Sequence, residues 1–107
     1  MSLPVILQRE AEEQIVTSAR WWAKHRSVEQ AERWYAGILA AIDSLDTKAA
    51  RYPLARENES FPYDLRTMNF GIGNRPTHRV LFTIRPDAVV VLSVRHAAQD
   101  DVTPEDM

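Results

Sequence analysis

The chain has no cysteine among its 107 residues, which excludes disulfide bonds and thiolate metal sites. Long apolar runs are missing as well: the longest, Ala88 to Leu92, is far shorter than the roughly 20 residues of a membrane-spanning helix. The amino terminus lacks the basic region and long apolar stretch of a signal peptide. We therefore expect a cytoplasmic protein with no membrane partner.

Lysine is scarce, and the other positive charges are unevenly distributed. Lys24 and Lys48 are the only lysines, and both fall in segments expected to be helical. From residue 66 to residue 96, by contrast, five arginines face a single acid, Asp87. These arginines are Arg66, Arg75, Arg79, Arg85 and Arg95. Such a local excess of positive charge indicates an anionic partner.

The acids are concentrated at the carboxyl end. Residues 97–107 contain four acids and no Lys or Arg: Asp100, Asp101, Glu105 and Asp106. Without this acidic tail, residues 1–96 carry 11 acids against 13 basic residues, a net charge of +2, although the whole chain has −2. We expect residues 1–107 to form one domain whose tail is solvated. The alternative is that the tail folds back over the basic region.

The spacing of apolar residues predicts secondary structure for the first half of the chain. Residues 3–8 form a short apolar run that predicts a first strand. Apolar residues then recur at helical spacing over residues 10–26. Ser27 is placed to cap a second helix, which we expect over residues 28–51 because Pro53 follows. The two helices should form a helical hairpin.

Three strands are predicted after a loop at residues 54–63. They cover residues 64–70, 77–85 and 89–94, and the last two flank a Pro86-Asp87 turn. This order predicts an α+β fold in which the helices cover one face of an antiparallel sheet, with the last three strands as a three-stranded meander.

The register of the last hairpin determines where its arginines point. In one possible register the numbers of paired residues sum to 174, so that Val80 lies opposite Val94 and apolar residues share one face. In the other register the numbers sum to 173, and polar and apolar residues are mixed on both faces. Because register follows the hydrophobic pattern where one face is buried, we expect the first register. Its helix-facing set is Val80, Phe82, Ile84, Val90, Leu92 and Val94.

In this register Arg79 lies directly opposite Arg95, and like charges in that position are destabilising. Either an external anion lies between them, or carboxylates from flanking segments neutralise them. Arg66, on the adjacent strand, and Arg85 are expected to extend the same anion- or partner-binding face. The candidate carboxylates are Glu57, Asp100 and Asp101.

Other residues allow only limited chemistry. His96 could act as a general acid or base, or could simply be packed, while His78 is expected to face solvent. The three histidines have no acids at ligand spacing, so no metal is expected. Gly71-Ile72-Gly73 lacks the third glycine of a dinucleotide-binding loop, and no cofactor is expected.

Three short sequences, together with the order of elements, resemble the RelE/ParE superfamily of toxin–antitoxin toxins. They are Asp64-Leu65-Arg66, His78-Arg79-Val80-Leu81-Phe82 and Val94-Arg95-His96, within a similarity that extends over residues 3–99. The resemblance implies the toxin of a type II system, of the kind also called plasmid stabilisation proteins. It also implies a cognate antitoxin whose carboxy-terminal segment wraps the toxin. We expect that antitoxin to be acidic or amphipathic where it crosses the arginines, with a helix filling an apolar groove.

The superfamily has two branches with different targets. RelE-like members cleave messenger RNA on the ribosome without a metal, and ParE-like members poison DNA gyrase. For an RNase, Arg79 would stabilise the pentacoordinate phosphate, Arg66 would hold the scissile phosphate, and His96 would protonate the leaving oxygen.

This sequence departs from the nuclease pattern. Phe82 stands where a tyrosine is common, and Ala97-Ala98 follow His96 where an aromatic hydroxyl is frequent. The acidic net charge also disfavours stable, direct binding to DNA. We therefore expect a ParE-like toxin that acts on gyrase and is not itself an enzyme. The alternatives are a RelE-like endoribonuclease and an inactive antitoxin-binding module.

Overall fold

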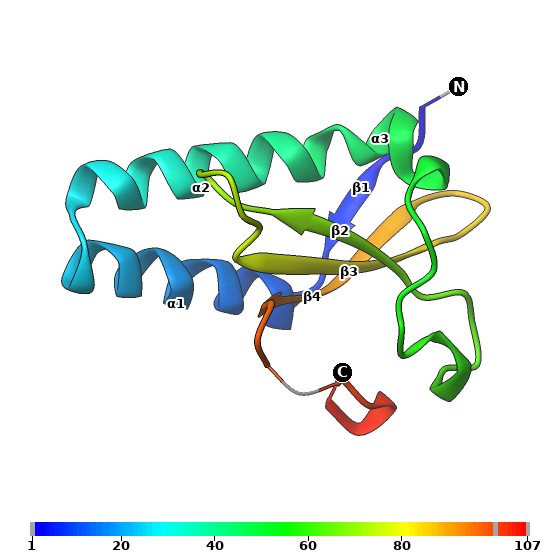
Figure 1. Ribbon diagram of the computed structural model, residues 1–107. Helices are drawn as coiled ribbons and strands as arrows, with labels where there is room; N and C mark the ends of the chain where they lie inside the picture. Colours follow the sequence, from blue (N-terminus) through cyan, green and yellow to red (C-terminus); the bar gives the residue numbers. More distant parts are fainter. Residues whose placement is uncertain (1, 100, 107) are drawn as a thin grey trace.

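A computed structural model describes residues 2–99 and 101–106 and shows a helical pair packed on a four-stranded sheet (Figure 1). The strands are β1 (Val5–Leu7), β2 (Arg66–Phe70), β3 (His78–Ile84) and β4 (Val89–His96). The sheet order is β1-β4-β3-β2. The predicted α+β class is confirmed, and β2, β3 and β4 form the predicted antiparallel meander. The prediction that the whole sheet is antiparallel is wrong, because β1 pairs with β4 in parallel.

The two long helices agree closely with the sequence pattern at their start. They are α1 (Arg9–His25) and α2 (Val28–Asp43). The Ser27 hydroxyl accepts a hydrogen bond from the Gln30 amide at 3.0 Å, which caps α2 as predicted. None of the helices in the described part of the chain combines the length and apolarity needed to cross a membrane.

The second helix is shorter than predicted. It ends at Asp43, and the chain continues as α3 (Leu45–Lys48) and the short 3₁₀ turn η1 (Ala49–Arg51). At the break, the Ser44 hydroxyl donates to the carbonyl of Ala41 at 2.6 Å. A serine that bonds back to the preceding turn competes with the helical backbone and bends it.

The first hydrophobic core lies between the helices and the sheet. Its largest member, Trp34 of α2, is fully buried beside apolar residues of both helices and of the strands. Burying a large apolar side chain contributes about 1.5–3 kcal/mol, so this core stabilises the packing of the helices on the sheet. Its central residues are Ile15, Trp34, Ile38, Ile42, Val80, Phe82 and Val91.

A β-bulge in the last hairpin changes the register midway. Leu81 pairs with Ser93 as predicted, but Phe82 pairs with Val91, so both registers considered from the sequence occur in one hairpin. A bulge inserts one residue and reverses the faces of those beyond it. Two residues predicted to face the helices therefore lie on the opposite face, Val90 and Leu92.

That opposite face is covered by a second hydrophobic core. The loop before β2 and the carboxy-terminal segment lie below the sheet, away from α2 (Figure 1). Val102 is 2% exposed, so the acidic tail folds back, and the expectation of a solvated tail is wrong for this part of it. Asp100 lies outside the described residues. The second core contains Ala55, Phe61, Leu65, Leu81, Ala88, Val90, Leu92 and Val102.

Candidate functional site

Arg79 is enclosed in the second core and bound by a carboxylate of the same chain. It is only 6% exposed, so it does not belong to an open anion-binding face. Its Nη1 donates to Glu57 Oε2 at 2.9 Å, and its Nη2 donates to Glu57 Oε1 at 2.6 Å. The backbone amide of Val102 adds a third donor to Glu57 Oε2 at 3.1 Å. Glu57, one of the candidate carboxylates, therefore neutralises Arg79.

The pair is held in its charged form. Burial alone would raise the pKa of Glu57, but the hydrogen bonds from Arg79 and from the Val102 amide outweigh burial and lower this pKa to about 2. The hydrogen bonds to Glu57 raise the pKa of Arg79, although burial acts in the opposite direction. Both side chains are therefore ionised at neutral pH.

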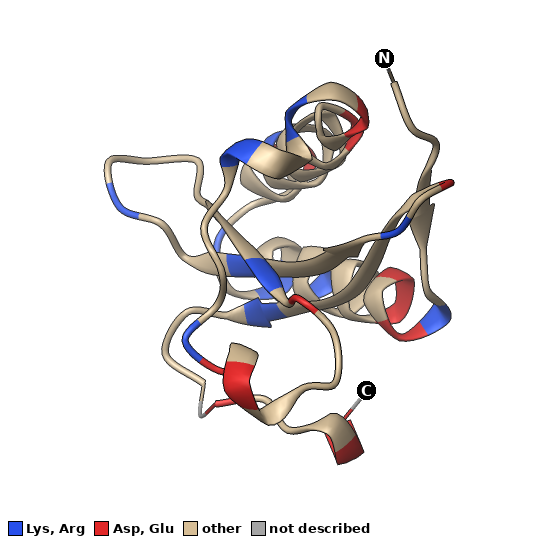
Figure 2. Cartoon of the chain, turned by 90° about the vertical axis from the view of Figure 1, so that its right-hand side faces the viewer, with Lys and Arg blue, Asp and Glu red and all other residues tan. Residues whose placement is uncertain are grey.

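Arg56 extends this charge network to the tail. Its Nε lies 2.5 Å from Asp101 Oδ1, and its Nη2 donates to the carbonyl of Gln99 at 3.3 Å. Both partners of the ion pair are about half exposed, so the pair itself contributes little stability. In Figure 2, the acidic positions of the loop and tail lie beneath the basic positions of the central strands. The sequence prediction missed Arg56 because it lies in a loop without periodicity.

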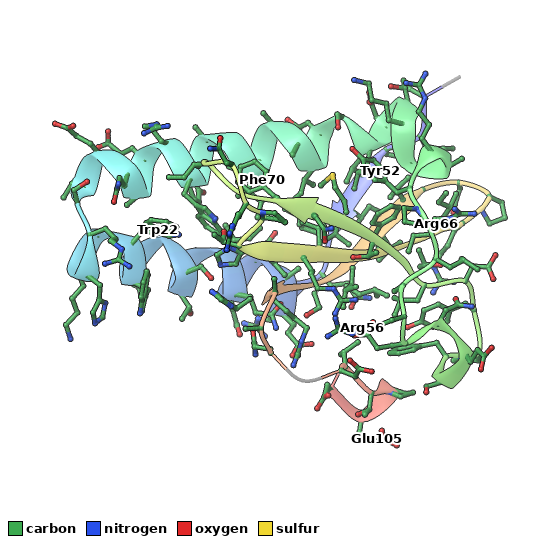
Figure 3. The ribbon with its side chains drawn as sticks, in the orientation of Figure 1. Trp22, Tyr52, Arg56, Arg66, Phe70 and Glu105 are labelled. Carbon is green, nitrogen blue, oxygen red and sulfur yellow. The ribbon has the colours of Figure 1, made fainter. Side chains whose placement is uncertain are left out.

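Of the remaining predicted arginines, Arg95 shares a face of the sheet with Arg79, whereas Arg66 does not. Arg95 lies directly opposite Arg79, as the predicted register requires, and is partly buried. Arg66 pairs with Phe82 and therefore lies on the helix side of the sheet. There its Nη1 donates to the carbonyl of Tyr52 at 2.6 Å, and Figure 3 shows the two residues together, away from Arg56. Arg85 is exposed just beyond the end of β3.

The two histidines at the end of the sheet lie close together. His78 is 5% exposed, so the prediction that it faces solvent is wrong. Its Nδ1 accepts from Trp34 Nε1 at 3.3 Å and lies 2.7 Å from Thr77 Oγ1. Burial, and to a lesser extent the proximity of His96, lower the pKa of His78 to about 4. The two rings meet edge to face, with centroids 5.4 Å apart, and His96 is exposed.

The three residues considered for an RNase reaction are not brought together. His96 pairs with His78 at one end of the sheet, while the neighbouring Arg79 points to the opposite face. Arg66 shares the histidines' face but lies opposite Phe82, which is four residues from His78 and so about 13 Å along the strand.

A cleft instead opens between α1 and the ends of β3 and β4. We name it the α1–β4 cleft; its volume is about 660 Å³, within the range of binding pockets. It is lined by Glu10, Glu13, Gln14, Thr17, Ser18, Trp21, Trp22, Arg26, Thr77, His78, Val94, His96 and Gln99. The sequence offered one signal for this cleft: Trp21 falls outside the apolar stripe of its helix, and it is 47% exposed.

Comparison with known proteins places the fold. A solved structure described as the chromosomal ParDE toxin–antitoxin system from P. aeruginosa superposes with a TM-score of 0.70. It is 16% identical and covers 89% of this chain and 96% of that one. The YoeB dimer from Staphylococcus aureus is 11% identical, with a TM-score of 0.45 and coverage of 90% and 98%. No curated protein shows a significant match to this sequence.

A family model supplies the assignment. The model described as the ParE toxin of the type II toxin-antitoxin system parDE matches residues 5–101, nearly the whole chain. The matched region contains both long helices, all four strands and the Glu57–Arg79 pair. The chain therefore belongs to the ParE toxin family of type II toxin–antitoxin systems.

Proposed function

We propose that this ParE-family toxin acts in the cytoplasm on DNA gyrase and is neutralised there by a cognate antitoxin. A metal-free RNase would need Arg66, Arg79 and His96 around one phosphate. Because these residues lie apart in the structure, we favour gyrase over messenger RNA as the target. The similar ParDE structure is described as a toxin–antitoxin system, which supports an antitoxin partner.

The state of Arg79 further supports a mode of action other than phosphate chemistry. Its guanidinium is already bound through two hydrogen bonds to Glu57. To engage an RNA phosphate it would have to leave a buried carboxylate unpaired, and breaking such a pair costs about 3–5 kcal/mol. Arg79 is therefore better suited to holding the loop before β2 against the sheet. In this proposal the exposed Arg85 and the partly buried Arg95 contact a partner surface.

The proposal is tested with purified toxin in a gyrase supercoiling assay. We expect inhibition of supercoiling or accumulation of cleaved DNA, with reversal when the cognate antitoxin is added. A coupled transcription–translation reaction, with RNA ends mapped, provides the comparison and should leave transcripts intact. Ribosome-dependent, codon-phased cuts would instead assign the RelE-like activity. Tight antitoxin binding without either effect would identify an inactive binding module.

A further inference from the structure

The strand β4 extends beyond its neighbour at one edge. β1 pairs with it only from Val5↔Val89 to Leu7↔Val91, whereas β4 continues to His96. Within residues 2–99 and 101–106, no strand lies beside β4 past Val91 on this side. The sheet therefore has an unfilled strand position that continues the line of β1.

Two glutamine side chains occupy that position. Gln14 Oε1, from α1, accepts the Val94 amide at 2.6 Å and the Ser93 hydroxyl at 3.0 Å. Gln99 Oε1 accepts the His96 amide at 2.7 Å. A glutamine oxygen has the same acceptor chemistry as a backbone carbonyl, so each glutamine replaces one carbonyl of an absent strand. Gln99 is exposed and can be displaced readily.

The α1–β4 cleft gives this edge the room that a polypeptide segment needs. Val94, His96 and both glutamines line the cleft, and α1 forms its other wall. Trp21 on that wall is 47% exposed, and a partly exposed tryptophan is a frequent anchor of protein interfaces. The cleft thus combines a strand edge with an aromatic contact.

The charges in the cleft indicate which segment fits. Glu10 and Glu13 lie near the amino-terminal end of α1, and Glu13 has only a loose, exposed ion pair with Arg9 at 3.6 Å. At the other end Arg26 lies over the Trp21 ring, 5.7 Å from its centroid. A basic side chain therefore suits the Glu10 end, and an apolar side chain suits the tryptophan end.

We infer that an extended segment of the antitoxin binds in the α1–β4 cleft as an added strand beside residues 93–96, with a basic residue facing Glu10 and Glu13. Its backbone replaces the Gln99 oxygen at the His96 amide. The inference rests on the antitoxin partner that the family assignment brings, and it does not depend on gyrase as the target.

The first test measures antitoxin affinity with a matched pair of charge reversals. Glu10→Lys changes the cleft, and Glu59→Lys makes the same change in an exposed turn outside the cleft. We expect Glu10→Lys to raise the antitoxin Kd about tenfold or more, while Glu59→Lys stays within about twofold. Equal affinities for the two folded variants would overturn the inference. A gyrase assay on both variants tests the proposed target separately.

The second test identifies the acceptor of the His96 amide by NMR, through scalar coupling across the hydrogen bond in labelled toxin. In the free protein, the His96 nitrogen should couple to the side-chain carbonyl carbon of Gln99. In the complex, it should couple to a backbone carbonyl carbon of the antitoxin. A coupling to Gln99 that persists in the complex would overturn the added strand, even if Glu10→Lys weakens binding.

Discussion

Glu57 and Arg79 form an ionic cross-link inside a largely apolar layer, and each is satisfied mainly by the other. Their side chains are 1% and 7% exposed, so neither charge has water to replace its partner. A buried ion pair is costly to assemble and more costly to break, because the surviving charge remains desolvated.

Glu57→Gln should therefore destabilise the fold strongly. We expect a loss of about 3–5 kcal/mol in the free energy of unfolding, measured by urea denaturation. The exposed Glu59→Gln serves as the control and should change stability by less than about 0.5 kcal/mol. A loss of similar size in both variants would contradict the role assigned to the pair.

His78 should make stability depend on pH. Its pKa of about 4 in the fold lies below its ordinary value of 6.5, so the unfolded chain binds the proton first as pH falls. Its contribution is fully present above pH 6.5 and is lost as pH falls to about 4, on the order of 3 kcal/mol in total. Unfolding measured between pH 7 and pH 5 should show a slope of the unfolding free energy with pH that His78→Asn reduces, and an unchanged slope would contradict the role of His78.

Among the elements, the turn between β2 and β3 depends on one close backbone approach. A side chain at Gly71 would collide with the carbonyl oxygen of Arg75, whereas one at Gly73 would meet no atom within 4 Å. Gly71 is therefore required by contact with the returning chain, and Gly73 is not.

The variants Gly71→Ala and Gly73→Ala test whether the close backbone approach at Gly71 matters for stability. Gly71→Ala should lower the free energy of unfolding by about 1–3 kcal/mol, because the turn must shift to accept the methyl group. Gly73→Ala should stay within about 0.5 kcal/mol of the parent protein. The measurement is thermal unfolding of the two variants. Indistinguishable transitions would contradict the claim that the close approach to Arg75 requires glycine at position 71.

The sequence predicted elements well where periodicity was strong and less well where it was not. The cap at Ser27 and the Arg79↔Arg95 pairing both follow from local pattern and are present. The bulge was not predictable, because residues 88–92 are all apolar and fit either face. The α1–β4 cleft was not predictable either, because its walls come from segments far apart in sequence.

At the scale of the whole molecule, the tail contributes both to the packing of the second core and to the net charge of the chain. Val102 completes the second core, while Asp101 pairs with Arg56. The four acids after residue 96 also reverse the sign of the net charge, from +2 to −2. The tail thus limits attraction to polyanions while it covers the face that carries Arg79.

Truncation after Ala98 should reveal both roles. The loss of Val102 should reduce the free energy of unfolding by at least about 1.5 kcal/mol. The remaining chain, with a net charge near +2, should bind duplex DNA in a salt-dependent manner that the full chain does not show. Urea denaturation and DNA titrations at two salt concentrations measure the two effects. Unchanged behaviour in both would contradict the role of the tail.

The parallel pairing of β1 with β4 has a consequence for biosynthesis. β1 is translated before both long helices, whereas its partner β4 is translated after them, and Val102 follows later still. While β4 and Val102 remain in the exit tunnel, the helical pair can form but neither core can close. Synthesis therefore includes an interval in which an antitoxin already present can meet an open sheet.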